Sequence, residues 1–119
     1  MTIKDWQKAI HEYAVSKGWW PDIGAEEGAG HVSARALGDQ VANFHSELSE
    51  AWEEYRNGRP LTEVRVENGK PEGFPIELAD CVIRILDTCE AYGIDLEKAL
   101  EMKHAYNLTR PVRHGGKRA

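Results

Sequence analysis

The segment from Pro75 to Tyr92 places the strongest constraint on the fold of this chain. Proline is tolerated in the first turn of a helix, where its missing N–H costs nothing, and Gly93 is suited to end the same helix. Apolar residues cover almost the whole circumference of this expected helix: Ile76, Leu78, Ala79, Cys81, Val82, Ile83, Ile85, Leu86 and Cys89. A helix that is apolar nearly all round is expected to be buried.

Charged residues nevertheless run along one narrow line of this helix. Glu77, Asp80, Arg84 and Asp87 follow one another at i, i+3, i+7 and i+10. Burying an unpaired carboxylate is costly, so these acidic groups need a cation. Arg84 can neutralise one carboxylate, but it cannot neutralise a full set that comes from two facing helices.

A second helix, expected over residues 32–57, supplies further acids. Its apolar stripe consists of Leu37, Val41, Phe44, Leu48, Trp52 and Tyr55. Glu47, Glu50 and Glu54 flank this stripe at i, i+3 and i+7. Glu53 points to the far side of the helix and is expected to be solvated.

Two helices that each present an acid-x-x-acid pair bring four carboxylates to one space: Glu47, Glu50, Glu77 and Asp80. Ligation by oxygen alone suits Mg²⁺ or Mn²⁺, with waters completing the shell, and this is the usual arrangement for handling phosphates. The pattern therefore predicts a Mg²⁺ site, with Mn²⁺ as a substitute. The alternative is an interhelical ion-pair network of Arg84, Arg56 and the acids. A di-iron centre is disfavoured, because Glu101-x-x-His104 is the one Glu-x-x-His pair in the chain.

The remaining segments complete an all-α fold in one domain over residues 1–119. A first helix is expected over 3–17, with Thr2 and Asp5 as a capping box, and a fourth runs from the cap Asp95 to 107 or 108. Residues 59–73 are expected to form a connector with a short extended piece at 63–67. A basic, flexible tail is expected from about residue 109.

The charge distribution limits the partners. The formal net charge is −5, yet the last 17 residues hold five bases and no acid. A duplex nucleic acid binder would need a broad basic face, so this class is disfavoured, whereas a small polyanion would suit a basic tail.

No run approaches the roughly 20 apolar residues of a membrane helix, and charges occur throughout the first residues, so we expect a cytoplasmic protein. Cys81 and Cys89 are expected to be free buried thiols.

The C-terminal part offers donors for phosphate oxygens. Lys103, Asn107 and Arg110 lie at i, i+4 and i+7 across the end of the fourth helix, and Arg113 and Lys117 continue the basic segment. Lysine and arginine are suited to bind phosphate groups. The alternative is a cationic helix end that merely complements the helix dipole.

Two adjacent tryptophans, Trp19 and Trp20, fall in an expected loop. Large apolar rings either fill the core or stack on a planar ligand such as a nucleobase. Both interpretations stay open, and Trp20 is the candidate for contact with substrate.

The segments HSELSEAWEEYRNG, ELADCVIRILD and KHAYNLTRPVRHGGKR resemble the MazG-like branch of the all-α nucleoside triphosphate pyrophosphohydrolases. The likeness spans about residues 41–118. The family motif is EExxE, a spacer and ExxD; Ser46 stands where the family has its first Glu.

The resemblance implies a fold, a reaction and a set of roles. The fold would be a four-helix bundle completed by a second subunit, in a homodimer or homotetramer. The family cleaves nucleoside triphosphates, standard or non-standard, to the monophosphate and pyrophosphate. The implied Mg²⁺ ligands are Glu47, Glu50, Glu77 and Asp80, and the implied triphosphate contacts are Lys103, Asn107 and Arg110. We expect Glu47 or Glu50 to hold the attacking water.

Two alternatives to this activity stay open. The first is a nucleotide-binding or interaction module without catalysis on the same scaffold. The second is a phosphoribosyl-ATP pyrophosphohydrolase, which shares the helical architecture.

Overall fold

The computed structural model describes residues 1–20 and 34–111. Its elements are α1 (Ile3–Ser16), α2 (Ala34–Arg56), β1 (Arg65–Glu67), β2 (Lys70–Glu72), α3 (Phe74–Ala91) and α4 (Leu96–Leu108). The mainly helical fold is confirmed, and the helix ends that fall within the described residues lie within about two residues of the predicted ones. The expected start of α2 at residue 32 lies outside the described residues.

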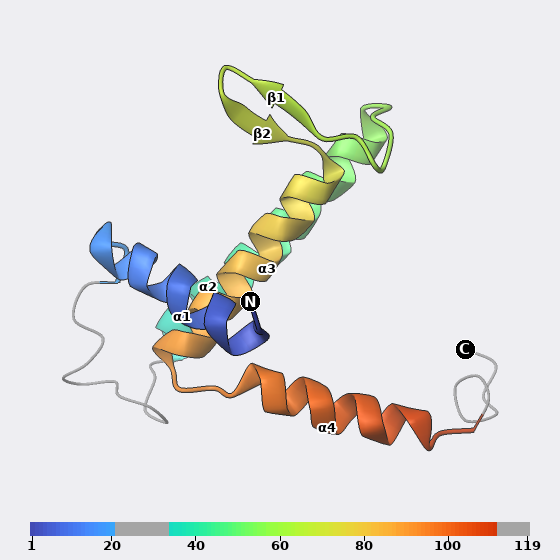
Figure 1. The fold of residues 1–119 in the computed structure, drawn as a ribbon. Helices are drawn as coiled ribbons and strands as arrows, with labels where there is room; N and C mark the ends of the chain where they lie inside the picture. Colours follow the sequence, from blue (N-terminus) through green and yellow to red (C-terminus); the bar gives the residue numbers. More distant parts are fainter. Residues whose placement is uncertain (21–33, 112–119) are drawn as a thin grey trace.

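Helices α2 and α3 form the centre of the molecule, where they run side by side in opposite directions (Figure 1). Small residues are buried where these helices meet, since Ala51 on α2 is 2% and Cys81 on α3 is 5% exposed. The Cys81 thiol donates a hydrogen bond to the carbonyl of Phe44 across this contact. Cys81 and Cys89 are both buried and free, as the sequence predicts.

Helix α1 begins at the predicted capping box, in which Thr2 and Asp5 cap each other's backbone N–H groups. It crosses the lower end of the α2–α3 pair in Figure 1. The buried Gln7 amide donates to the Glu90 carboxylate at 3.0 Å and to the carbonyl of Ile94 at 2.9 Å. These polar contacts fix the angle of α1 against the end of α3.

Helix α4 is attached mainly through its first turn. Lys4 lies 3.4 Å from the cap residue Asp95, and the Lys4 backbone N–H donates to Glu97. All residues from Lys98 to Leu108 are exposed, and the helix runs away from the α2–α3 pair (Figure 1). The described part of a single chain therefore does not close a four-helix bundle by itself, and the expected bundle completed by a second subunit stays a prediction.

The connector between α2 and α3 forms a β-hairpin, whereas the sequence predicts only one short extended piece there. The extended piece expected at 63–67 overlaps β1, which pairs with β2 as an antiparallel hairpin. Asn68 and Gly69 both have positive φ, at 53° and 78°, as a two-residue hairpin turn requires. The Arg65 guanidinium donates to both Glu54 carboxylate oxygens at 3.1 Å, which ties the hairpin to α2.

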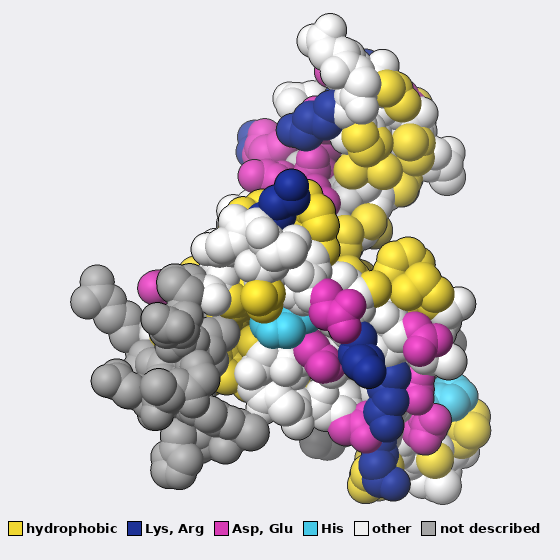
Figure 2. Space-filling model, turned by 60° about the vertical axis from the view of Figure 1, so that its left-hand side comes forward, with side chains coloured by type: hydrophobic (Ala, Val, Ile, Leu, Met, Phe, Trp, Pro, Cys, Tyr) yellow, Lys and Arg dark blue, Asp and Glu magenta, His cyan; other side chains and the backbone are white. Residues whose placement is uncertain are grey.

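A wide apolar face is left uncovered by the described residues of the single chain. The predicted stripe of α2 is partly in solvent, with Leu48 at 47% and Trp52 at 55% exposed. The expectation that α3 is buried on all sides is wrong for one chain, because Val82 is 51% and Ile83 42% exposed. Hydrophobic side chains gather over the upper part of the molecule in Figure 2.

The overall dimensions agree with an open arrangement. The radius of gyration is 17.2 Å, whereas a compact chain of this length would have about 13.5 Å.

Within the described residues, no helix combines the length and apolar character needed to cross a membrane.

Gly73 joins the hairpin to α3 at a position that excludes any side chain. Its φ is +134°, and a Cβ atom there would lie 2.2 Å from the carbonyl oxygen of Glu63. We expect Gly73→Ala to lower the free energy of unfolding by about 3 kcal/mol or more, from strained backbone and steric clash together. Urea unfolding followed by circular dichroism measures this.

The matched control is Gly69→Ala. Gly69 also has positive φ, at +78°, but nothing lies within 4 Å of its added Cβ. This change should cost only about 1 kcal/mol. Equal losses in the two variants would contradict the proposed close approach at Gly73.

Candidate metal centre and adjoining cavity

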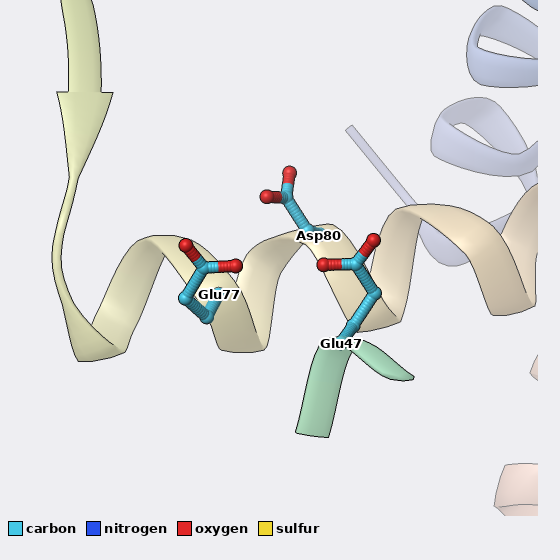
Figure 3. Close-up of side chains that lie close together, drawn as sticks. All are labelled: Glu47, Glu77 and Asp80. Carbon is cyan, nitrogen blue, oxygen red and sulfur yellow. The ribbon is translucent and has the colours of Figure 1, made fainter. Parts of the chain in front are cut away.

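Three of the four predicted carboxylates converge where α2 meets the start of α3. Glu77 and Asp80 come from successive turns of α3, and Glu47 reaches them from α2 (Figure 3). One oxygen of each lies within 4.8 Å of the others. The fourth, Glu50, is exposed beside this group and hydrogen-bonds with Glu77. We call Glu47, Glu77 and Asp80 the carboxylate cluster.

Burial makes the carboxylate cluster costly without a cation. Glu47 is 7% exposed and Glu77 is 9% exposed. The Oε2 atoms of both are buried and accept no hydrogen bond from the described part of the chain. Buried oxygens of this kind carry an uncompensated desolvation cost, which a divalent cation between them would remove. The donor set, all oxygen, fits Mg²⁺ or Mn²⁺.

Burial and, after it, mutual repulsion raise pKa values in the carboxylate cluster. Burial, followed by the hydrogen bond and negative charge of Glu50, raises the pKa of Glu77 to about 7. Burial also raises the pKa of Asp80, followed by the charge of Glu47, while Arg84 opposes this increase. The acids therefore resist carrying their full charge in the absence of a cation.

Arg84 supplies one positive charge, as the sequence predicts. Its Nε–H donates to Glu47 Oε1 at 2.6 Å. Arg56, the other arginine considered for an interhelical network, instead pairs with the exposed Glu53 at 3.0 Å on the outside of α2. One guanidinium thus faces three acids and the neighbouring Glu50, so the ion-pair alternative is realised only in part.

A second acidic group is a weaker candidate for a metal. Glu54, Glu72 and Glu77 also place one oxygen each within 4.8 Å of one another. Glu54 already receives the Arg65 guanidinium, and Glu72 lies 3.4 Å from Lys70 Nζ. Because the chain's own cations occupy this group, the carboxylate cluster is the better site.

A cavity of about 490 Å³ adjoins the carboxylate cluster between α1 and the α2–α3 pair. Its lining comprises Trp6, Ala9, Ile10, Tyr13, Ala14, Trp19, Gln40, Glu47, Asp80, Ile83, Arg84 and Asp87. The walls are thus mainly apolar and aromatic, and the acids and Arg84 supply its polar part. Its volume suits a small organic ligand. The sequence did not predict this cavity, because it depends on how α1 crosses the other helices.

Trp20 belongs to a packed cluster beside this cavity. Its indole N–H donates to Asp87 Oδ2 at 2.8 Å, and the other Asp87 oxygen lies 2.8 Å from His11 Nδ1. The Trp20 ring meets the rings of His11 and Tyr92 edge to face. Trp19, not Trp20, lines the cavity, so stacking of a ligand on Trp20 stays a prediction.

The predicted phosphate donors lie elsewhere. Lys103 and Asn107 are exposed on α4, and Arg110 is exposed just after it; none of them contributes to the cavity or to the acidic groups of the described residues. Asp80 is separated from the end of α3 by about 16 Å of helix before α4 begins. Arg113 and Lys117 lie outside the described residues.

Comparison of the chain with protein-family models, with curated protein sequences and with solved structures gives no match.

The raised pKa of Glu77 predicts an unusual dependence of stability on pH. The folded protein holds a proton at Glu77 up to about pH 7, whereas the unfolded chain releases it near 4.5. Between these values the folded state binds more protons, so the free energy of unfolding of the metal-free protein should fall as pH rises. Urea unfolding in a chelator at several pH values measures this.

Glu77→Gln is the diagnostic variant, because its amide stays neutral at every pH. We expect a flatter pH profile and a higher stability than wild type above pH 7. Added Mg²⁺ should stabilise the wild type at pH 8 and have little effect on the variant. A wild-type stability that rises steadily from pH 5 to 8 without metal would contradict the assignment.

Proposed function

We propose that this protein is a Mg²⁺-dependent nucleoside triphosphate pyrophosphohydrolase that converts a (deoxy)nucleoside triphosphate to the monophosphate and pyrophosphate. The observation that supports it most is the pair of buried, unpartnered oxygens on Glu47 and Glu77 next to an aromatic cavity. A site for a divalent cation and a site for a planar ring thus adjoin each other. A nucleoside triphosphate fits both sites, because its base is a planar ring and its phosphates bind divalent cations.

The substrate would lie with its nucleoside in the cavity and its phosphates at the carboxylate cluster. Trp6, Tyr13 and Trp19 offer aromatic surface to a nucleobase. Glu47 and Asp80 line the same cavity and belong to the carboxylate cluster. The α-phosphate, which joins the nucleoside to the diphosphate, would therefore lie where the two regions meet.

The chemistry is attack of water on the α-phosphorus. A divalent cation held by Glu47, Glu77 and Asp80 would neutralise the phosphate charge that opposes this attack. Glu50 is exposed beside the carboxylate cluster, whereas Glu47 is engaged by Arg84. Glu50 is thus the better base: it orients the water and takes its proton as the bond from the α-phosphorus to the bridging oxygen breaks and pyrophosphate leaves.

Pyrophosphate release from a panel of nucleoside and deoxynucleoside triphosphates, with Mg²⁺ or Mn²⁺, tests the activity. We expect Glu50→Gln and Asp80→Asn to lower kcat by about 10² to 10⁴ while circular dichroism shows a folded protein. Glu53→Gln is the matched control, because Glu53 is an exposed acid on α2 whose partner is Arg56. It should retain activity.

Several outcomes would count against this proposal. Full activity of Glu50→Gln or Asp80→Asn would place the site elsewhere. Binding of nucleotide without any product would favour a module without catalysis. Turnover restricted to phosphoribosyl-ATP would favour the second alternative.

We further propose that the working form is a homodimer or homotetramer in which a second copy covers the apolar face of α2 and α3. Leu48, Trp52, Val82 and Ile83 are too exposed for a stable isolated surface of this kind. The cations of α4 lie far from the carboxylate cluster of their own chain. A second copy could bring its Lys103 and Arg110 to the phosphates, so that each site would combine two chains.

Co-expression of two inactive chains tests this arrangement. An Asp80→Asn chain and a Lys103→Ala, Arg110→Ala chain should each be inactive alone. Random pairing in a dimer makes about half of the dimers mixed. Each mixed dimer has one complete site out of two, so about a quarter of wild-type activity should return. No recovery in mixed assemblies, purified through two different tags, would place the α4 cations outside the partner's site.

A further inference from the structure

Arg84 lies at the boundary between the carboxylate cluster and the aromatic cavity. It is one turn after Asp80 on α3, its Nε–H donates to Glu47 at 2.6 Å, and it lines the cavity. No other basic side chain lines this cavity among the described residues. Arg84 is therefore the positive group best placed to meet an anion that enters from the cavity.

The guanidinium keeps most of its hydrogen-bonding capacity. An arginine has five N–H donors in a fixed planar arrangement. Only Nε has a hydrogen-bond partner in the described part of the chain, and the side chain is 43% exposed. The two terminal amino groups can thus bind an oxyanion through two parallel hydrogen bonds, the geometry that arginine offers to phosphate.

The charges favour such an anion once a divalent cation is present. In the free protein, Arg84 is attracted by Glu47 and by the neighbouring Asp80. A divalent cation in the carboxylate cluster would neutralise these acids and repel the guanidinium, which leaves it short of negative charge. A phosphate beside it restores the balance without breaking the Nε–H contact to Glu47.

We propose that Arg84 binds the α-phosphate of the substrate through its terminal amino groups while its Nε–H holds Glu47. This inference rests on the proposed function and adds the residue that links the nucleoside cavity to the carboxylate cluster. Arg84 thereby orients the α-phosphorus toward the water held by Glu50. It also makes tight binding of nucleotide depend on the same side chain that fixes a metal ligand.

Calorimetric binding to Arg84→Gln, with Mg²⁺ present, provides the test. The probes are a non-hydrolysable α,β-methylene triphosphate, a nucleoside monophosphate and inorganic pyrophosphate. Loss of two charge-assisted hydrogen bonds should weaken binding of the triphosphate analogue and of the monophosphate by about tenfold to a hundredfold. Pyrophosphate, which lacks the α-phosphate and the nucleoside, should bind within about threefold of wild type.

A readout on the metal separates this role from a structural one. Mn²⁺ alone, followed by electron paramagnetic resonance, should bind Arg84→Gln as tightly as wild type or more tightly, because a competing cation is gone. Arg84→Lys should recover only part of the monophosphate affinity, since lysine lacks the planar pair of donors. Arg56→Gln is the matched control and should leave all these affinities unchanged, because Arg56 ends α2 and pairs there with the exposed Glu53.

Contrary outcomes are clear in each measurement. Unchanged monophosphate affinity in Arg84→Gln would overturn the inference, and so would a parallel loss of Mn²⁺ and pyrophosphate binding, which indicates a merely structural arginine. If wild type itself binds none of the three probes, the proposed function fails first, and the two failures are thus distinguishable.

Discussion

The contact of α2 with α3 forces like charges together, and the rest of the site depends on this conflict. Burial of apolar side chains drives the two helices together, and the same contact carries Glu47 and Glu77 out of water. Arg84 donates to Glu47 and neutralises part of this negative charge, but its single positive charge cannot balance all the acids of the carboxylate cluster. The fold therefore keeps acids at a place where only a further cation makes their burial favourable.

The other elements hold this arrangement in place. The hairpin is tied to α2 by Arg65 and Glu54, and Gly73 brings the chain close enough to begin α3 with Glu77 in its first turn. Helix α1, held by Gln7 on the far end of α3, closes one side of the cavity. The metal candidate and the ligand cavity thus depend on contacts made at opposite ends of the same helix.

Sequence patterns predict well what depends on local spacing. The caps at Thr2 and Asp95, the helix ends and the shared face of Glu77 and Asp80 follow from such patterns. Asn68-Gly69 is also a strong hairpin pattern that could have revealed β2. The cavity could not be predicted, since it depends on the crossing angle of α1. The exposure of α3 could not be predicted either, because apolar composition does not say whether the covering surface comes from the same chain.

The reactivity of the two buried thiols, Cys81 and Cys89, depends on whether the packed helices around them separate. Burial raises the pKa of Cys81 and of Cys89, so neither is a good nucleophile while it stays buried, and Cys81 lies in the α2–α3 contact, where its thiol donates to the carbonyl of Phe44. They are separated by eight residues, or about 12 Å along the helix, too far to join as a disulfide. The rate of alkylation of Cys81 therefore measures how often α2 and α3 separate, and any cation that holds Glu47 against α3 would slow that reaction.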